Sequence, residues 1–350
     1  MKIFVTGGSG FIGSNFIKLH LEESQNEILN YDAQTYAGKG NNLSKYKEND
    51  NYRFIEGNIC DRKSLYKAIS MFKPDIIVHF AAESHVDRSI DDPLCFVNTN
   101  ILGTYHLLEI CRELLDNKLL IHESFKFIHI STDEVFGSLK NDGKFNEKSN
   151  YRPNSPYSAS KSSSDHLVRA WSKTYGIPSV ISNCSNNYGP FQYPEKLIPL
   201  LIVNCVDEKP LPIYGSGNNI RDWLFVEDHC KAINNIIDKG VPGQNYVIGG
   251  NNELKNIEIA SKICTLMDGL RPRKNNLKHS DLIVFVEDRP GHDFRYAIDA
   301  TKINNDLLWK PIESFETGIL KTINWYLKNE SWWREIQLAH YQQERLGLKE

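Results

Sequence analysis

Two pairs of side chains in the middle of the chain have the types and spacing for redox and acid–base chemistry on an alcohol. Tyr157 and Lys161 are four residues apart, so on a helix they share one face, where the ammonium can lower the pKa of the phenol and make it a base. Asp133 and Glu134 add two carboxyl groups, one of which could remove a proton while the other donates one, as the elimination of water requires. Hydride transfer alone needs neither carboxyl group, so the combination predicts oxidation coupled to dehydration.

Each pair also has a purely structural explanation. Adjacent acidic residues are common in the first turn of a helix, where they interact favourably with the helix dipole. A Tyr and a Lys can likewise share a solvent-exposed helix face. The positions of the pairs favour chemistry, because both follow the apolar, strand-like segment 127–131 and the hydroxyl residue Thr132.

A glycine-rich turn near the amino end predicts a dinucleotide site. Gly7, Gly10 and Gly13 follow a short apolar strand and open a helix, and a register that begins at Gly8 satisfies the same pattern. Such glycines permit a tight turn and a close approach of the backbone to a pyrophosphate. Asp32 comes 19 positions after Gly13, where a carboxylate can bind ribose hydroxyls and repel a 2′-phosphate. The pattern favours NAD over NADP, the alternative being a glycine turn without a ligand.

Residues after the next strands complete the predicted NAD site. Asn58 and Ile59 could flank the adenine, although an Asn at a strand end is usually a local hydrogen-bonding residue. Ala81 and Ala82 leave room for a cofactor, or simply permit tight backbone packing, and Thr99 would line the same cleft. The predicted cofactor-binding residues are Gly7, Gly10, Phe11, Ile12, Gly13, Asp32, Asn58, Ile59, Ala81, Ala82, Thr99, Tyr157 and Lys161.

Strands and helices alternate through the first half of the chain. This alternation predicts parallel strands joined by right-handed crossovers. The expected fold class is therefore α/β, with a Rossmann-type doubly wound parallel sheet and a smaller carboxyl-terminal substrate domain. The predicted strands are 2–6, 27–31, 52–56, 75–80, 127–131 and 179–183, and the predicted helices are 11–21, 62–72, 98–115 and 157–175.

The regular alternation stops near residue 184. Clusters of Pro and Gly beyond it indicate loops over the carboxyl edge of the sheet. We expect residues 1–183 to form an NAD-binding Rossmann domain, with returning segments near 223–250, and residues 184–350 to form mainly the substrate-binding domain. The clusters lie at 189–190, 209–212, 215–217 and 289–291.

Composition argues against several functional classes. The 350 residues include 41 Lys+Arg and 44 Asp+Glu, a formal net charge of -3, which gives no electrostatic basis for binding nucleic acid or an anionic membrane. No apolar run has spanning length, and no secretory signal pattern follows Met1. The seven cysteines lack Cys-x-x-Cys spacing, which argues against a disulfide framework or a zinc site. We therefore expect reduced thiols, no metal site and a cytoplasmic protein.

The order of these motifs resembles that of a known enzyme family. The glycine turn, Asp32, Thr132, Tyr157 and Lys161 are similar to those of the extended short-chain dehydrogenase/reductases, and the resemblance covers nearly the whole chain. Within that superfamily, several independent blocks resemble the dTDP-glucose 4,6-dehydratases. These blocks are residues 82–89, 131–135, 183–190, 194–199 and 221–223.

The resemblance implies NAD as cofactor, dTDP-glucose as substrate, commonly a homodimer formed through paired helices, and a role for each matching residue. Tyr157 would deprotonate the C4 hydroxyl during oxidation by NAD, while Lys161 holds the nicotinamide ribose and Thr132 hydrogen-bonds near the same hydroxyl. Glu134 would then remove the C5 proton, and Asp133 would protonate the departing C6 hydroxyl. Return of hydride to C6 and of a proton to C5 gives dTDP-4-keto-6-deoxyglucose, which makes the enzyme formally a lyase.

A nucleotide-sugar substrate needs groups for a diphosphate, sugar hydroxyls and a pyrimidine. Arg221 lies in a turn-rich segment and could bind phosphate through two parallel hydrogen bonds, the alternative being an ion pair with Asp222. His85 and Asp87 could contact the sugar or form a structural pair. The predicted substrate-binding residues are Ser84, His85, Asp87, Thr132, Asn187, Glu195, Lys196, Pro212, Tyr214, Arg221, Arg289 and His292.

Two positions depart from the family pattern. Phe136 stands where the family usually has Tyr, and Asn58 stands where it commonly has Asp. The first change removes a hydroxyl near the catalytic loop, and the second could weaken a contact with the adenine amine. Neither removes a proton-transfer group.

Other functions stay open on the sequence alone. A 4-epimerase needs Tyr157, Lys161 and NAD but no carboxyl pair, and a CDP- or UDP-sugar dehydratase would differ mainly in how it binds the base. A noncatalytic NAD-sensing protein would not need the hydroxyl, carboxyl and phenol groups together. The segment 332–334, which contains two Trp residues, could be an interaction patch or could pack against the substrate domain.

Overall fold

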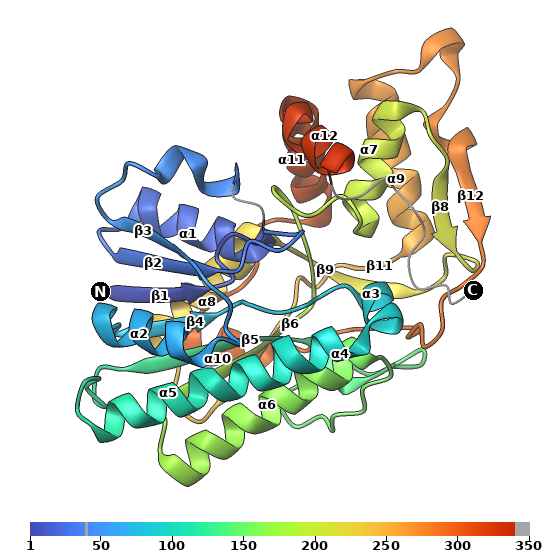
Figure 1. The fold of residues 1–350 in the computed structure, drawn as a ribbon. Coiled ribbons are helices and arrows are strands. Elements are labelled where there is room, and N and C mark those ends of the chain that lie inside the picture. The colour runs from blue at the N-terminus through green and yellow to red at the C-terminus, as the bar shows by residue number, and fades with distance from the viewer. Residues whose placement is uncertain (39–40, 340–350) are drawn as a thin grey trace.

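A seven-stranded sheet forms the centre of the computed structural model, which describes residues 1–38 and 41–339 (Figure 1). Its strands are β1 Lys2–Thr6, β2 Glu27–Asp32, β3 Tyr52–Glu56, β4 Ile76–His79, β5 Lys126–Thr132, β6 Ser179–Cys184 and β10 Asn245–Ile248. They lie in the order β10, β6, β5, β4, β1, β2, β3, and every neighbouring pair is parallel. The order reverses between β1 and β4, which confirms the predicted Rossmann-type fold.

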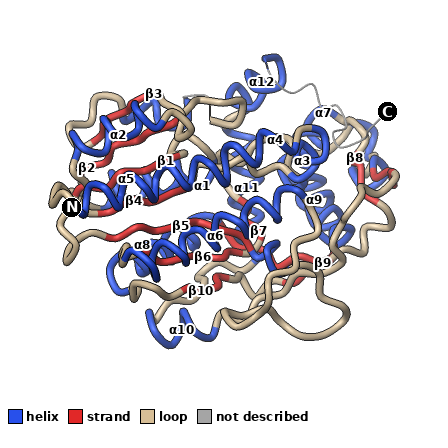
Figure 2. The backbone as a smooth tube through the Cα atoms, turned by 60° about the horizontal axis from the view of Figure 1, so that its bottom comes forward, coloured by secondary structure: helices blue, strands red, loops and turns tan. Residues whose placement is uncertain are grey.

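Helices cover both faces of the central sheet (Figures 1 and 2). In β1, Ile3 and Val5 face one layer and Phe4 faces the other, and all three are 0% exposed. Strands buried on both faces are near-continuous apolar runs, which is why their positions could be predicted closely. The first layer contains α1 (Phe11–Glu23), α8 (Val226–Lys239) and α10 (Thr301–Leu307), and the second contains α2 (Arg62–Phe72), α5 (Thr104–Asp116) and α6 (Pro156–Tyr175).

The helix predicted at 98–115 begins differently in the structure. After the short helices α3 (Val86–Asp91) and α4 (Pro93–Phe96), the segment Val97–Gly103 is a π-helix, η2, that continues into α5. The Asn100 side chain accepts from the N–H of Glu83 and donates to its carbonyl, both at 2.9 Å. The π-helix therefore holds the loop before α3, a position typical of π-helical turns near functional sites.

The chain beyond residue 184 has more regular structure than its sequence predicted. Its helices α7 (Leu197–Asp207), α9 (Asn256–Leu270) and α11 (Phe315–Lys328) pack on one another around a core of their own. The helix α7 was missed because it is a nearly continuous apolar run, which has no helical period. Small sheets complete this part: β7 (Asn186–Tyr188), β9 (Ile220–Phe225) and β11 (Glu253–Lys255) form one, and β8 (Leu211–Tyr214) and β12 (Ile283–Val286) form the other.

The last described helix, α12 (Glu330–Ala339), packs against α11 through its tryptophans. Trp333 is 0% exposed, and its ring nitrogen donates to the Tyr326 carbonyl at 3.0 Å. Packing, rather than an exposed patch, therefore accounts for Trp333. Among the helices of residues 1–38 and 41–339, none combines the length and the apolar character needed to cross a membrane.

Candidate active site

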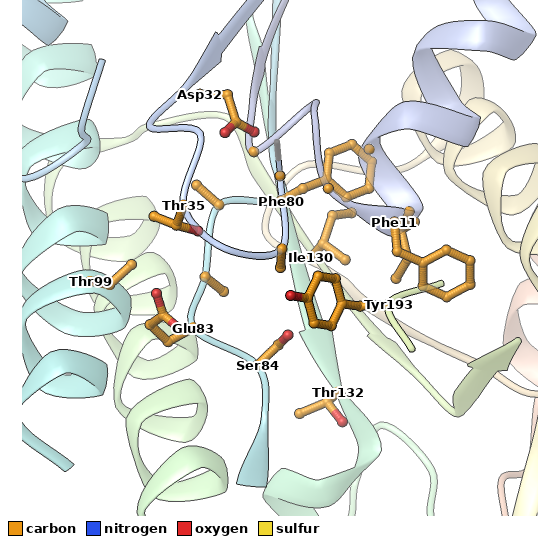
Figure 3. A pocket seen from close by; sticks show the side chains of 18 of the residues that line it. Phe11, Asp32, Thr35, Phe80, Glu83, Ser84, Thr99, Ile130, Thr132 and Tyr193 are labelled. Atoms are coloured by element: carbon orange, nitrogen blue, oxygen red, sulfur yellow. The ribbon is translucent and has the colours of Figure 1, made fainter. Parts of the chain in front are cut away.

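The carboxyl ends of the parallel strands open into a cavity of about 310 Å³, within the size range of ligand pockets. Ligands of doubly wound proteins bind at this edge, where the strand order reverses. Figure 3 shows its side chains from Asp32 at the end of β2 to Thr132 at the end of β5. The predicted site residues that line it are Gly7, Gly10, Phe11, Ile12, Gly13, Asp32, Asn58, Ile59, Ala81, Ala82, Ser84, Thr99, Thr132, Glu134, Tyr157, Lys161, Asn187, Glu195 and Lys196.

The glycine turn has the close packing that a phosphate-binding turn needs. Gly7 has a φ of +70°, and a Cβ at this position would lie 2.5 Å from the backbone nitrogen of Ala81. A Cβ at Gly13 would lie 2.4 Å from the Gly7 carbonyl oxygen, so α1 packs directly on the turn. A Cβ at Gly10 would approach only that oxygen, at 3.4 Å, which leaves the amino end of α1 open. Backbone N–H groups can therefore approach a phosphate without intervening side chains.

Asp32 is held beside this turn by two backbone hydrogen bonds. Its carboxylate accepts from the N–H groups of Ser9 at 2.9 Å and Gln34 at 2.8 Å. Burial raises the pKa of Asp32, while the two hydrogen bonds lower it. A carboxylate with this support keeps lone pairs that can accept from ribose hydroxyls. The open amino end of α1 and this carboxylate fit the pyrophosphate and ribose of NAD.

The remaining cofactor candidates lie around the same end of the cavity. Asn58 is exposed, and its Oδ1 accepts from the N–H of Cys60 at 2.8 Å, which leaves its amide nitrogen for an adenine contact. Ile59 is buried and packs against Gly103, while Thr99 lines the cavity from η2 (Figure 3). The π-helical start of α5 thus brings Thr99 to the cavity.

The start of α6 fixes Tyr157 and Lys161 in the cavity wall. Ser155 caps the helix, since its Oγ accepts from the Ser158 N–H at 3.1 Å, and Pro156 occupies the first turn. The Lys161 ammonium donates to the carbonyl of Ile130 in β5 at 2.8 Å. The helix cap therefore fixes the position of Tyr157 in the first turn of α6, and the Ile130 carbonyl fixes the Lys161 side chain.

The protonation state of Tyr157 differs from the one that its spacing from Lys161 suggested. Burial raises the pKa of Tyr157 well above its ordinary value, Glu134 raises it further, and a hydrogen bond with the Thr132 side chain lowers it. The ammonium of Lys161 is directed at a backbone carbonyl, and burial lowers its own pKa. The raised pKa favours the neutral phenol of Tyr157 in the protein alone, and Lys161 is not among the main influences on that pKa.

Asp133 is buried in a site that favours its neutral form. It begins the short 3-10 helix η3 (Asp133–Phe136), and its Oδ1 accepts from the Thr132 hydroxyl at 3.3 Å. Its Oδ2 has no hydrogen-bond partner among the described residues, and the side chain is 1% exposed. Burial, followed by the charge of Glu134, raises the pKa of Asp133 well above its usual value. This raised pKa favours the protonated form of Asp133 over a wider pH range than for an exposed carboxyl group.

Glu134 is adjacent to Asp133 but lies in the cavity wall among cations. Burial raises the pKa of Glu134, whereas Arg289, Arg221 and Lys196 lower it. Its N–H donates to Thr132 Oγ1 at 3.2 Å, which fixes the turn. Adjacent carboxyl groups in such different surroundings can act as an acid and a base at the same pH.

Arg221 is buried, and among the residues that the structure describes it forms no salt bridge with a carboxylate. Its guanidinium donates to the carbonyls of Ile220, Phe294 and Asp293 at 2.8–3.3 Å and stacks 4.3 Å from the Tyr296 ring. The neighbouring Asp222 instead accepts from the backbone N–H groups of residues 250 and 252, so the alternative ion pair is not formed. A buried guanidinium that interacts electrostatically with Glu134 but makes its hydrogen bonds to backbone carbonyls is well suited to an anionic ligand.

Four of the predicted substrate residues form a cluster that does not line this cavity. Asp87 accepts from Arg289 at 2.6 Å and from the Tyr214 hydroxyl at 2.9 Å, and His292 packs edge-on against the Tyr214 ring. Pro212 lies in the same strand, β8, as Tyr214. His85 does not pair with Asp87, because its Nδ1 instead caps α3. The His85–Asp87 pair suggested by the sequence is therefore absent.

The side chains of three further candidate substrate-binding residues form hydrogen bonds or ion pairs within the protein. Lys196 donates to the Ser84 carbonyl at 2.9 Å, and Glu195 pairs with Arg88 at 2.9 Å. The Asn187 amide donates to the Ser185 carbonyl at 2.9 Å, and its Oδ1 is 2.9 Å from His229 Nδ1. These contacts orient all three side chains in the cavity wall.

Several cavity residues were not predicted. Glu83 and Cys184 lie within the recognised blocks 82–89 and 183–190, and Gln192 and Tyr193 lie between two recognised blocks, so the available signal was their membership of or proximity to those blocks. Tyr36 had no local signal, because its role depends on contacts with distant segments. The departure at Phe136 lies outside the cavity, where the ring stacks on Phe145 at 5.2 Å.

Behind the cavity, one buried carboxylate joins four elements. Asp165 of α6 accepts from Ser131 at 2.8 Å, Tyr151 at 2.8 Å and Asn183 at 3.0 Å, and lies 3.1 Å from His129. These contacts lower the pKa of Asp165 despite the opposing effect of its burial. Asp165 therefore remains charged within a hydrogen-bonded network.

We expect the Asp165→Asn variant to lose about 3 kcal/mol of unfolding free energy, because an amide cannot accept from all of these donors. Urea denaturation followed by circular dichroism measures the loss. Tyr151→Phe is the matched control, since it removes one hydrogen bond and should cost about 1 kcal/mol. Equal denaturation midpoints for Asp165→Asn and the parent would contradict a stabilising role for the carboxylate.

The whole chain matches known proteins. The family described as GDP-mannose 4,6 dehydratase matches residues 4–322. A probable dTDP-glucose 4,6-dehydratase of Sinorhizobium fredii is 53% identical over 351 aligned residues, which cover 100% of this chain and 99% of the relative.

Solved structures agree with the sequence relatives. The dTDP-glucose 4,6-dehydratase DesIV of Streptomyces venezuelae, solved with NAD and a second ligand, has a TM-score of 0.88 and 40% identity over 96% of this chain and 100% of that chain. The dTDP-glucose 4,6-dehydratase of Bacillus anthracis, solved with NAD, has a TM-score of 0.84 and 44% identity over 96% of this chain and 99% of that chain. The chain therefore belongs to the dTDP-glucose 4,6-dehydratase family of extended short-chain dehydrogenase/reductases.

Proposed function

We infer that the protein is an NAD-dependent hydro-lyase that converts dTDP-glucose to dTDP-4-keto-6-deoxyglucose. Family membership supports the substrate and the cofactor. The observation that carries the chemistry is the carboxyl pair, because burial raises the pKa of Asp133 well above its usual value, while the charges of three cations oppose the effect of burial on Glu134 in the cavity wall. A dehydration requires both a proton donor and a proton acceptor, and this pair supplies them.

In the first stage, Tyr157 must first lose its own phenol proton to solvent, and its phenolate then takes the proton of the C4 hydroxyl as that carbon is oxidised. NAD, when bound, supplies the oxidation at C4 and the matching reduction at C6, and its oxidised form brings positive charge to the site. Thr132 hydrogen-bonds Tyr157 and lowers its pKa, which assists this proton transfer. Lys161, fixed by the Ile130 carbonyl, would hold the nicotinamide ribose. The open turn at Gly10 and the carboxylate of Asp32 would hold the pyrophosphate and the other ribose.

In the second stage, Glu134 removes the C5 proton, which the 4-keto group acidifies, and Asp133 protonates the C6 oxygen as water leaves. The environments support this division of roles. Burial raises the pKa of Glu134, but positive charge from Arg289, Arg221 and Lys196 opposes this effect and favours the anionic form that can act as a base. Asp133 has no such dominant set of cations and keeps its proton. Return of the C5 proton by Glu134 completes the 4-keto-6-deoxy sugar.

We propose that the substrate is bound by residues around the carboxyl pair. Arg221 supports this placement best, since it is buried and makes no ion pair with Asp222. Lys196 and Arg289 would add positive charge for the diphosphate. The sugar and the base would contact the remaining candidates, which are Ser84, His85, Asp87, Asn187, Glu195, Pro212, Tyr214 and His292.

We also propose that different parts of the chain bind the cofactor and the substrate. Residues 1–183, with the returning segment near 223–250, would bind NAD, and the rest of 184–350 would mainly bind the nucleotide sugar. The pairing of β10 with β6 in the central sheet supports the returning segment. A cytoplasmic location is consistent with seven cysteines, none of which forms a disulfide in the structure.

A homodimer is proposed from an apolar stripe on the outward face of the α4–α5 region. Leu94, Val97, Leu102 and Tyr105 recur at helical spacing and are 65%, 45%, 41% and 38% exposed. Such a stripe on a soluble fold is typical of an interface, and the self-complementary surface of a twofold dimer would cover it. Light scattering at micromolar concentration would give a single-chain mass if this proposal is wrong.

An isotope experiment tests the proposed function. The purified protein is supplied with dTDP-glucose carrying deuterium at C4, and the product is examined by NMR and mass spectrometry. Dehydration predicts that the label moves to C6 with loss of water. An epimerised sugar that retains the label at C4 would instead indicate a 4-epimerase. Turnover of a CDP- or UDP-sugar in preference to dTDP-glucose would reassign the base.

A further inference from the structure

Three segments that are far apart in sequence meet at the cavity through four side chains. Tyr36 comes from the loop after β2, Arg88 from α3, and Tyr193 and Glu195 from the loop before α7. The Arg88 guanidinium lies 4.0 Å from the centre of the Tyr36 ring, and that ring meets Tyr193 edge-on at 5.4 Å. Arg88 also donates to the Glu195 carboxylate at 2.9 Å. The four residues form one continuous set of contacts.

These contacts are internal, not features of an exposed surface. The Glu195 and Arg88 side chains are 2% and 27% exposed, and Tyr193 is 6% exposed. Tyr36, Tyr193 and Glu195 all line the cavity. Figure 3 shows the Tyr193 ring between the Asp32 end and the Thr132 end of the cavity. A dinucleotide that reaches from Asp32 to Lys161 would therefore pass beside this set.

The loop that carries Tyr193 is anchored from the opposite side. Phe191 meets Trp325 at 4.8 Å and Trp332 at 5.9 Å, and the Pro190 carbonyl accepts from Asn15 at 2.9 Å. Trp332 also donates to Asn42 at 2.8 Å. The aromatic carboxyl-terminal segment thus supports the loop. The tryptophan-containing segment 332–334 therefore has a structural role.

The described part of the loop that carries Tyr36 is residues 33–38. It is attached to the Asp32 carboxylate through the N–H of Gln34 at 2.8 Å, and the Tyr36 ring is its aromatic contact with the opposite wall. Loss of that ring would release the loop beside the predicted ribose site while the Phe191 anchor stays in place. We therefore expect the exit of a ligand to depend more on Tyr36 than on the loop that Phe191 anchors.

We propose that Tyr36, Arg88, Tyr193 and Glu195 form a clasp that retains NAD in the cavity through successive turnovers. The proposal rests on the proposed function, because a reaction that returns its hydride to the sugar leaves NAD oxidised, as it began, and requires no exchange of cofactor. If the clasp opens, the cation–π contact between Arg88 and Tyr36 and the edge-on contact between Tyr36 and Tyr193 are lost together. The clasp residues are positioning residues and take no part in proton transfer.

The test measures NAD release directly. Purified parent and variant proteins are loaded with radiolabelled NAD, and loss of label is followed after addition of excess unlabelled NAD. Tyr36→Ala should release NAD about tenfold faster, because it removes both ring contacts. Tyr36→Phe keeps the ring and should release NAD at the parent rate. Arg88→Lys keeps the charge beside Glu195 but loses the planar stacking, and it should also release NAD faster.

Tyr175→Ala is the matched control, since Tyr175 also stacks with an arginine, Arg112, at 5.0 Å but does not line the cavity. If Tyr36→Ala and Tyr175→Ala release NAD at the same rate, the clasp does not retain the cofactor. Dehydration by Tyr36→Ala should recover to within about twofold of the parent when NAD is saturating. Failure to recover would assign Tyr36 to the chemistry and overturn the proposal. Failure of deuterium transfer in the parent would instead reject the proposed function, because NAD release is measured without substrate.

Discussion

Replacing Asp133 with Asn should slow the elimination of water about 10²- to 10⁴-fold while C4 of dTDP-glucose is still oxidised. The amide has nearly the same shape as the acid but cannot supply an acidic proton to the leaving C6 oxygen. Rapid quenching and mass spectrometry distinguish the 4-keto sugar that still carries its C6 hydroxyl from the product that has lost water. The variant should accumulate the former.

The pH dependence of elimination provides a second test of Asp133, because the direction of the rate change can be predicted. Because burial raises the pKa of Asp133, its proton is present below that raised value and is lost as the pH increases through it. Elimination by the parent should therefore slow at high pH, and Asp133→Asn should lack this dependence. Equal loss of oxidation and elimination would instead indicate a mainly structural Asp133.

Glu134→Gln is the matched variant for the other carboxyl group. If Glu134 removes the C5 proton, this variant should lose exchange of the C5 hydrogen with deuterated solvent, whereas Asp133→Asn should retain it. Both substitutions exchange a carboxyl group for an amide in the same short turn, so a general disturbance of η3 would affect the two alike. Similar exchange rates in both variants would contradict separate roles.

The second large effect is expected at Tyr157, where substitution by Phe should slow C4 oxidation about 10²- to 10⁴-fold. Phe lacks the phenol oxygen but retains the ring that meets Phe96 at 6.3 Å, so the fold should be preserved. Since burial and Glu134 raise the pKa of Tyr157, oxidation by the parent should become faster as the pH rises. Formation of the 4-keto sugar, measured across a range of pH, tests both statements.

The control for this variant lies in the same helix. Tyr175 is at the end of α6 and is 50% exposed, so Tyr175→Phe should keep the parent rate. When the 4-keto sugar itself is supplied, Tyr157→Phe should still exchange the C5 hydrogen, because Glu134 is intact. Loss of exchange together with oxidation would mean that the substitution disturbs the whole site.

The elements nearest the chemistry were the easiest to predict from the sequence. The strands at 2–6 and 52–56 and the helix at 62–72 have the predicted bounds, and the ends of β5 and α6 fall within one residue of the prediction. The central strands are largely apolar, whereas the edge strand β3 is mostly exposed, and the ends of the strands carry Gly, Asp or Thr, which are strong local signals. The glycine turn, Asp32 and the carboxyl pair follow directly from those strand ends.

Prediction was weakest where regular structure depends on distant partners. The helices α7, α9 and α11 bury their apolar faces mainly against one another, and loop-forming Pro and Gly clusters between them dominated the local pattern. The π-helical start at Val97–Gly103 likewise depends on Asn100 binding the loop at Glu83. No local sequence pattern records either kind of contact.

The sequence by itself determined which groups could react, namely a Tyr–Lys pair, two adjacent carboxyl groups and a dinucleotide turn, because spacing along a strand end or helix fixes which side chains are neighbours. Only the tertiary structure decided the protonation states that these groups favour. Burial of Asp133 without a hydrogen-bond partner for Oδ2 among the described residues favours its protonated form, whereas cations from distant segments oppose the effect of burial on Glu134. The phenol of Tyr157 is neutral for the same reason, since pKa values depend on desolvation and on charges brought together by folding.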